Sequence, residues 1–306
     1  MNQSHETFHS GFAAVAGRPN VGKSTLINAV LGQKIAAVSR KPQTTRLKQL
    51  GIYTSDDTQI IFIDTPGIHI PRHKLGKGMN ALALEALRDA DVILWVVDAS
   101  QPPHQEDDLI TGKLVDMPKI PPVIQVLNKS DLLNSTEIEL SKKEFGDLYP
   151  GIRQQVISAA KLVGLEELLA ITREYLPQAE AFYPDDQITD YHERQIAANI
   201  IRESALENLK EEVPHAIAVR IDEYKERDQK GAYISATIFV EKESQKGIVI
   251  GKNGAMLKAI GTEARLAIEL MSNRKVFLEL HVKVHKNWRR DENFLRRMGY
   301  SDLGVD

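Results

Sequence analysis

The chain has 306 residues, enough for two domains of ordinary size, and its charge is nearly balanced, with 39 Lys or Arg against 42 Asp or Glu. The absence of cysteine excludes disulfides and thiolate chemistry, and no apolar run approaches the roughly 20 residues of a membrane-spanning helix. Because the amino terminus, MNQSHE, also lacks the features of a secretory signal, we expect a soluble cytoplasmic protein, with peripheral attachment to the inner face of the cell membrane left open.

The first predicted strand, 12–16, leads directly into a phosphate-binding loop, which a helix over 23–31 follows. Glycine at 17 and 22 lets the backbone N–H groups of this loop converge on an anion, and the helix start adds its positive dipole end. Lys23 can bridge two phosphates, and the Ser24 hydroxyl can ligate Mg²⁺. The predicted phosphate-binding residues of this loop are Gly17, Arg18, Pro19, Asn20, Val21, Gly22, Lys23, Ser24 and Thr25.

A polar loop, 39–46, separates this helix from the next strand. A threonine hydroxyl in the loop would complete the shell of Mg²⁺ only when a γ-phosphate is present, as in the switches of GTPases. We favour Thr45 over Thr44 for this role. The alternative is that both threonines are ordinary polar loop residues.

Strands over 47–53 and 59–64 flank a turn and predict an antiparallel hairpin. The second strand ends in a DTPG sequence, whose aspartate can hold Mg²⁺ through water and whose glycine N–H can meet a γ-phosphate. By itself DTPG could be a simple turn, but it follows a phosphate-binding loop in the chain. The predicted phosphate-site residues here are Asp64, Thr65, Pro66, Gly67 and Ile68.

Further buried strands are predicted over 92–97, 123–127 and 155–157, and the motifs that follow the last two predict guanine recognition. The Asp131 carboxylate can accept both the N1–H and the amino group of guanine, whereas adenine would leave that charge unpaired. Small residues at 158–160 allow a backbone N–H to approach the guanine O6 atom. The predicted guanine-binding residues are Asn128, Lys129, Ser130, Asp131, Ser158, Ala159 and Ala160.

Helical patterns over 79–87, 107–115, 135–145 and 165–175 alternate with these strands. This alternation predicts an α/β fold with a mostly parallel sheet and helices on both faces, in which ligands bind beyond the carboxyl ends of the strands. We place this GTPase domain at 1–176. A segment at 177–190 that carries two prolines and shows no sustained periodicity is predicted to be a linker.

Residues 191–306 predict a second, α+β domain. Its order is a helix (192–209), two strands (216–224 and 233–240), a Gly-rich turn, a helix (255–271) and a strand (275–285). The last strand alternates between apolar and polar residues, which predicts a sheet covered on one face. An Arg-rich helix is expected over 287–299.

The Gly-rich turn of this second domain is G-K-N-G, within a segment, 246–297, that holds 12 Lys or Arg against 5 Asp or Glu. A G-x-x-G turn between helices can clamp a nucleic-acid backbone, and the positive excess favours that function over a mere packing turn. The predicted RNA-binding residues are Lys246, Ile250, Gly251, Lys252, Asn253, Gly254 and Lys258.

Together, the motifs GRPNVGKS, PQTTR, DTPG, NKSD, SAA and VIGKNGAMLKAI resemble those of the bacterial Era family, in which a P-loop GTPase domain precedes a type II KH domain. The resemblance covers essentially the whole chain. It implies a slow GTPase that needs Mg²⁺ and binds single-stranded RNA near the 3′ end of 16S rRNA during assembly of the 30S ribosomal subunit. We also expect a monomer.

Hydrolysis needs a water-orienting group, and Ile68 stands where Ras-like switches carry glutamine. The resemblance implies instead that Asn20 helps to bind K⁺ near the phosphates, although Asn20 could merely brace the loop. The candidate catalytic set is Lys23, Asn20, Thr45 and Gly67, with Mg²⁺ held by Ser24, Thr45 and, through water, Asp64.

Two other functions compete with this interpretation. One is a structural RNA-binding protein with a vestigial nucleotide site, against which the intact nucleotide motifs argue. The other is a GTPase of tRNA modification or ion transport, against which the lack of a second catalytic domain, of membrane spans and of a cysteine argues.

Overall fold

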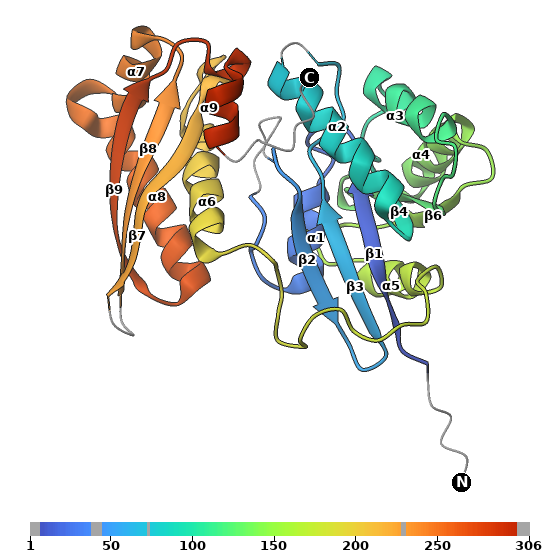
Figure 1. Cartoon of the computed structure of the whole chain (residues 1–306). Coiled ribbons are helices and arrows are strands. Elements are labelled where there is room, and N and C mark those ends of the chain that lie inside the picture. Colours follow the sequence, from blue (N-terminus) through green and yellow to red (C-terminus); the bar gives the residue numbers. More distant parts are fainter. Residues whose placement is uncertain (1–6, 38–44, 72–73, 228–230, 299–306) are drawn as a thin grey trace. The chain divides into compact units, whose positions relative to one another are not determined.

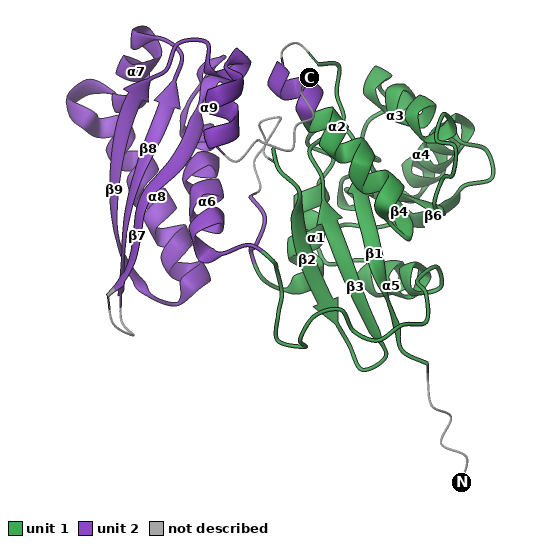
Figure 2. Cartoon of the chain, in the orientation of Figure 1, with its two compact units in different colours: residues 1–33, 45–71, 79–190 green, residues 34–44, 72–78, 191–306 purple. Residues whose placement is uncertain are grey.

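The computed structural model describes residues 7–37, 45–71, 74–227 and 231–298 (Figure 1). These residues form two compact units, shown in Figure 2. The first comprises the described residues within 1–33, 45–71 and 79–190, and the second those within 34–44, 72–78 and 191–306. Each unit has its own sheet, which confirms the predicted fold class of an α/β domain followed by an α+β domain.

The sheet of the first unit has the strand order β2-β3-β1-β4-β5-β6. Within the described sheet β2 runs antiparallel to β3, and the other pairs are parallel. Strands β3 and β4 are buried at every position, as expected where helices cover both faces. The strands are β1 (His9–Ala16), β2 (Gln49–Thr54), β3 (Thr58–Asp64), β4 (Val92–Asp98), β5 (Val123–Asn128) and β6 (Arg153–Val156).

Helices of the first unit follow strands, and three of them, α2, α3 and α4, cover one face of the sheet around Trp95 and Phe145. The carboxyl ends of the parallel strands therefore meet at one edge, where the loops with the nucleotide motifs begin. The helices are α1 (Lys23–Leu31), α2 (Lys74–Asp89), α3 (Gln105–Val115), α4 (Ser135–Leu148) and α5 (Leu165–Arg173).

The segment 177–190, which the sequence predicts to be a linker, packs along the first unit. Its backbone forms isolated bridges to β1 and β2, between His9 and Gln178 and between Gly51 and Thr189. The side chain of Gln59 donates to the carbonyl of Tyr183 and accepts from the N–H of the same residue, at 2.8 and 3.0 Å. Because these contacts use mostly backbone groups, they leave no hydrophobic periodicity in the sequence.

The sheet of the second unit has the order β7-β8-β9, with β7 and β8 antiparallel and β8 and β9 parallel. Helices α6 and α8 pack on one face, as Figure 1 shows, and the core lies between them and the sheet. The elements are α6 (Glu193–Asn208), β7 (Ala218–Arg227), β8 (Gly231–Val240), α7 (Glu243–Ile250), α8 (Ala255–Ser272), β9 (Lys275–Val284) and α9 (Glu292–Arg297).

The tail differs from the single helix that the sequence predicts over 287–299. A short 3-10 turn, Trp288–Arg290, precedes α9, and Asp291 separates the two. The Asp291 carboxylate accepts a hydrogen bond from the Phe294 N–H at 3.0 Å, so it caps α9 instead of continuing a helix. Gly299 lies outside the described residues.

Candidate functional site

The predicted phosphate-binding loop lies between β1 and α1, at the carboxyl edge of the first sheet. Gly17 has a φ of 149°, and a Cβ there would overlap the carbonyl oxygen of Val96 on β4. The Lys23 ammonium donates to the carbonyls of Gly17 and Arg18, both at 3.0 Å. Burial lowers the pKa of Lys23 from 10.5 to about 8, so its charge is costly in the absence of an anion.

Three oxygen-bearing side chains converge beside this loop. The Ser24 hydroxyl donates to Asp64 Oδ2 at 2.9 Å, and the Thr45 hydroxyl donates to the same oxygen at 3.0 Å. The Ser24 and Thr45 hydroxyls are 3.0 Å apart. The structure thus places Thr45 beside Ser24 and Asp64, while Thr44 and the rest of 39–44 lie outside the described residues.

This cluster fits a hard cation. Burial raises the pKa of Asp64, and its Oδ1 atom has no hydrogen-bond partner in the described part of the chain. Mg²⁺ prefers such oxygen ligands and usually keeps several waters and substrate phosphates in its shell. No group of three or more His, Asp or Glu among the described residues could hold a metal by itself. A cation here would therefore take some of its ligands from these side chains and others from the phosphates of a nucleotide.

The DTPG segment lies against the phosphate-binding loop. A Cβ on Gly67 would stand 2.8 Å from the backbone nitrogen of Pro19, so only glycine allows this close approach. The Ile68 N–H donates to the Gly17 carbonyl at 3.2 Å, and the Thr65 hydroxyl donates to the Val15 carbonyl at 2.8 Å. The Ile68 side chain is buried in the core, which explains why a polar residue is not accommodated there.

The two predicted guanine-binding segments are joined to each other and to the loop. Asn128 donates to the Val21 carbonyl at 2.9 Å and accepts from the Ala159 N–H at 3.0 Å. The Ser158 hydroxyl donates to Asp131, which orients that carboxylate. Ser130 lies in a short 3-10 turn beside them, and Ala160 is exposed. All four nucleotide motifs therefore meet at one edge of the first unit.

Several residues at this edge have no motif in the sequence. Asp98, at the end of β4, accepts from the Lys129 ammonium at 2.6 Å. Asp107, on α3, accepts from the Arg18 guanidinium at 3.2 Å. Asp98 could have been noticed as an acidic residue at the carboxyl end of a buried strand. Asp107 gives no such signal, since polar residues on a helix usually face solvent.

The remaining predicted residues of the loop occupy its surface and its base. Asn20 is exposed and has a φ of 67°, a left-handed conformation that asparagine tolerates. Val21 is fully buried, and Thr25 lies in the first turn of α1.

In the second unit, the G-x-x-G turn joins α7 to α8. Gly251 and Gly254 have φ values of 72° and 78°, and a Cβ on Gly251 would stand 2.7 Å from the Cβ of Met256. The side chains of Lys252 and Asn253 are exposed at the tip of the turn. The turn therefore offers backbone groups at a glycine-lined surface, as a nucleic-acid clamp requires.

Lysines flank this turn on both helices. Lys246 on α7 is half-buried, Ile250 ends the same helix, and Lys258 on α8 is exposed. Among the described residues, none forms an ion pair with Lys246, Lys252 or Lys258. Their charges are thus available to an anionic ligand. No helix in the described ranges is both long and apolar enough to cross a membrane.

Two family models match the chain. The model described as a 50S ribosome-binding GTPase matches residues 12–129, and the model of the KH domain matches residues 212–289. The KH match lies in the second unit, and the GTPase match lies mainly in the first.

The relatives extend the likeness over nearly the full length. GTPase Era of Geobacter metallireducens is 47% identical over 299 residues, which are 97% of this chain and 100% of the relative. Among solved structures, Era in complex with MgGDPNP and nucleotides 1506–1542 of 16S ribosomal RNA has a TM-score of 0.91. A variant of Aquifex aeolicus Era bound to GDP and AlF4⁻ has a TM-score of 0.90. Both structures are 40% identical and cover 96% of this chain, which covers 99% of each.

Proposed function

The chain belongs to the Era family of GTPases, and from this premise we propose how its residues hold GTP and what the second unit binds. As a member of this family it is an enzyme that hydrolyses GTP to GDP and phosphate, and Mg²⁺ accompanies the nucleotide in the matched structure of Era. The observation that carries the proposal is the match of both units at once, with every nucleotide motif at one sheet edge.

We assign the phosphates to the loop 17–25 and to the DTPG segment 64–68. Lys23 keeps its two carbonyl partners and directs its third N–H to the phosphates, whose negative charge relieves the cost of its buried charge. The Ser24 and Thr45 hydroxyls ligate Mg²⁺ directly, and Asp64 holds it through water. The convergence of these three side chains supports the assignment.

The guanine base is assigned to 128–131 and 158–160. The Asp131 carboxylate accepts hydrogen bonds from the base, and the backbone at Ala159 faces the guanine O6 atom. The hydrogen bonds of Asn128 to Val21 and Ala159 support a single rigid pocket, because they join the phosphate loop to both base segments. A rigid pocket loses little entropy when the nucleotide binds.

For hydrolysis, we propose K⁺ as a second cation beside the phosphates, held in part by Asn20. Ile68 is buried in the core and carries no polar group, so it does not orient the attacking water. An exposed amide at the tip of the phosphate loop supplies an oxygen ligand of the kind K⁺ accepts. Gly67, through its N–H, contacts the γ-phosphate in the same proposal.

The second unit, on this proposal, binds single-stranded RNA near the 3′ end of 16S rRNA, and the protein acts in assembly of the 30S subunit. The relative solved with nucleotides 1506–1542 of 16S rRNA supports this, as do the exposed G-x-x-G turn and its lysines. We further propose a cytoplasmic monomer that contacts the inner face of the cell membrane only peripherally. A domain boundary near 190, with 177–190 as the connecting segment, completes the proposal.

Crosslinking to cellular RNA tests the RNA proposal. The protein is crosslinked with and without a non-hydrolysable GTP analogue, and the bound RNA is sequenced. We expect reads to accumulate at the 3′ end of 16S rRNA for the wild-type chain and to disappear for a variant with Lys252→Asp and Asn253→Asp. Reads spread evenly over cellular RNA would contradict the assignment of the ligand.

A further inference from the structure

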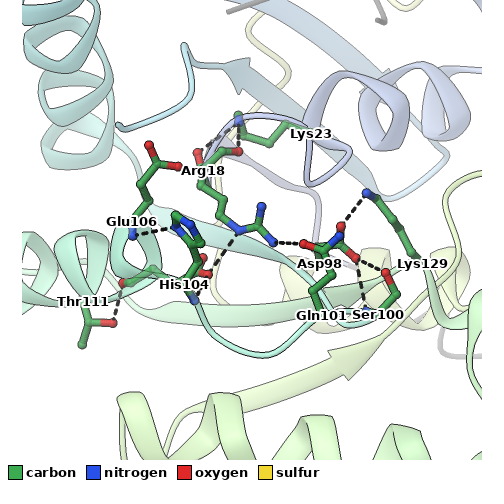
Figure 3. Close-up of polar contacts among 11 residues, drawn as sticks. Arg18, Lys23, Asp98, Ser100, Gln101, His104, Glu106, Thr111 and Lys129 are labelled. Carbon is green, nitrogen blue, oxygen red and sulfur yellow. Dashed lines mark hydrogen bonds and ion pairs between the residues drawn. The ribbon is translucent and has the colours of Figure 1, made fainter. Parts of the chain in front are cut away.

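One loop touches two of the nucleotide motifs without belonging to either. It runs from the end of β4 to the first turn of α3, residues 98–107, and we call it the brace loop. At its start, the Asp98 carboxylate accepts from the Lys129 ammonium at 2.6 Å. At its end, Asp107 accepts from Arg18, and Gln101 accepts from the same guanidinium at 3.3 Å. Figure 3 shows the contact of Asp98 with Lys129 and that of Gln101 with Arg18.

Arg18 reaches the brace loop with its side chain and the nucleotide site with its backbone. Its guanidinium is held by Asp107 and Gln101, and its side chain is 12% exposed. Its carbonyl oxygen accepts from the Lys23 ammonium at 3.0 Å. The position of that carbonyl, and thus of Lys23, depends on where the guanidinium is anchored.

Asp107, which holds the Arg18 guanidinium, is itself fixed by its surroundings. The Asp107 side chain is fully buried, and its Oδ2 atom also accepts from the His104 N–H at 3.0 Å, within the capping box of α3. Its Oδ1 atom has no partner among the described residues. A buried carboxylate of this kind is held in one place by the groups that satisfy it, and Arg18 is the cation among them.

At the other end of the brace loop, hydrogen bonds also hold the Asp98 carboxylate in place. Its Oδ1 atom accepts from the Ser100 N–H and hydroxyl at 3.2 and 2.6 Å, which leaves Oδ2 directed at Lys129. Lys129 has a φ of 67°, so its backbone is in a conformation that surrounding contacts must impose.

We propose that the brace loop is a positioning element of the GTPase site. Arg18 acts through Lys23 on the phosphates, and Asp98 acts through Lys129 on the base. Arg18 is accordingly a positioning residue, because its side chain contacts the brace loop and not the phosphates. This inference rests on the proposed function, because it presumes that the nucleotide lies where the four motifs meet.

The test uses the full chain and compares two perturbations. Arg18→Ala removes the anchored guanidinium, and Arg18→Gln combined with Asp107→Asn keeps a neutral hydrogen-bonded pair without a buried, unpaired charge. We expect KM for GTP to rise about tenfold in Arg18→Ala with kcat changed less than about twofold, because a misplaced Lys23 weakens binding of GTP and its transition state alike. The KM of the double variant should lie between that of Arg18→Ala and that of the wild type.

The ratio of GTP to XTP affinity distinguishes the roles of the two ends of the brace loop. Arg18→Ala should keep the wild-type ratio of GTP to XTP affinity, whereas Asp98→Asn should lower that ratio with a smaller change in KM for GTP. A merely structural role would lower the unfolding temperature of each variant and leave KM and the ratio unchanged at temperatures well below unfolding. That result would overturn the proposal.

Arg153→Ala is the matched control, because it also removes an arginine from an ion pair of the first unit, with Glu174 at 2.6 Å. It should retain wild-type KM. If neither the wild-type chain nor this control binds GTP, the proposed function fails. If both bind and Arg18→Ala binds equally well, the brace-loop proposal alone fails.

Discussion

Gly22 and Asn128 approach each other so closely that a Cβ on Gly22 would overlap the side-chain amide nitrogen of Asn128. Gly22 is the N-cap of α1 and has a φ of 101°, in the region that favours glycine. Asn128, on the far strand β5, uses the same amide nitrogen to bond the Val21 carbonyl. The phosphate motif and the base motif are therefore fitted against each other directly, without an intervening side chain.

This fit predicts the effect of Gly22→Ala. The substitution adds backbone strain and forces Asn128 from its bond to Val21, so we expect a loss of at least about 2 kcal/mol in the free energy of unfolding. Affinity for GDP should fall as well, because the base segment shifts. Denaturant unfolding and calorimetric titration measure the two effects.

Gly32→Ala provides the control for that prediction. Gly32 ends α1 with a φ of 64°, but a Cβ there meets nothing within 4 Å. The control should lower the free energy of unfolding by about 1 kcal/mol, through the strain of the left-handed backbone alone, and leave GDP affinity unchanged. Equal effects of the two substitutions would mean that the overlap with Asn128 has no energetic consequence.

The buried charge of Lys23 predicts a pH dependence of stability in the nucleotide-free protein. The pKa of Lys23 is lowered to about 8 in the folded state, against 10.5 for an ordinary lysine, because burial penalises the charged form. Between these two values the unfolded chain binds a proton that the folded chain has released. The free energy of unfolding should therefore rise with pH from about 8 to 10.5, by about 3 kcal/mol in total.

The Lys23→Met variant isolates this effect from other groups that titrate in the same range. Below pH 8 it should be more stable than the wild type, since no charge is buried, and the difference should vanish towards pH 10.5. Chemical denaturation across this pH range supplies the measurement. A difference between the two chains that does not vary with pH would remove Lys23 as its source.

Asp131→Asn should change the choice of base. Xanthine presents a carbonyl where guanine has an amino group, so an amide at 131 can pair with xanthine and loses a charge-assisted bond to guanine. We expect about ten- to hundredfold weaker binding of GTP and a preference shifted towards XTP. Titration with GTP, ATP and XTP decides it, with Glu139→Gln on α4 as a control that removes an exposed carboxylate elsewhere. An unchanged preference for GTP would exclude Asp131 from base recognition.

The nucleotide motifs could be predicted because their residues are close in sequence and each follows a buried strand. The alternation of strands and helices then places them at one edge, as Ser24, Asp64 and Asn128 show. Thr45 lies with Ser24 and Asp64, whereas Thr44 lies outside the described residues, so the choice between the two threonines stays a prediction.

Contacts between distant segments with no motif of their own could not be predicted. Arg18 and Asp107 are 89 residues apart, and nothing in a helical pattern distinguishes a buried aspartate from a solvated one. The same holds for Gln59, whose side chain fastens Tyr183 of the segment 177–190 across 124 residues. The tail was predicted wrongly as one helix, because Asp291 caps a new helix by a local bond that the Arg-rich composition obscures.

The proposed K⁺ site predicts that hydrolysis is faster in KCl than in NaCl at equal ionic strength, which separates a specific ion effect from screening. Asn20→Gly should abolish the difference. Glycine keeps the backbone at a φ of 67° without strain, so this variant removes the side-chain amide and leaves the backbone conformation unchanged. Asn20→Asp should retain a response to K⁺. Equal rates in the two salts for the wild-type chain would reject the K⁺ assignment and leave GTP binding intact.

The last prediction concerns coupling between the two ligands. RNA and GTP bind different sites on one chain, so any influence of one on the affinity of the other is a coupling free energy and must be reciprocal. The elements that can change with the γ-phosphate are the loop 42–46 and the segment 68–74, of which 42–44 and 72–73 lie outside the described residues. We expect RNA affinity to differ between the chain loaded with a GTP analogue, with GDP and with no nucleotide.

Charge reversal in the G-x-x-G turn tests the same coupling from the other side. Lys252→Asp with Asn253→Asp places carboxylates where RNA phosphates dock and should abolish RNA binding, while GTP affinity without RNA stays at its wild-type value. Lys210→Asp with Asn293→Asp makes the same change of net charge in the second unit and should retain RNA binding. Added RNA should shift the GTP affinity of this control and of the wild type by the factor by which GTP shifts RNA affinity, and should leave the turn variant unaffected. RNA affinities that are identical in all three nucleotide states would show two independent binding modules instead of a switch.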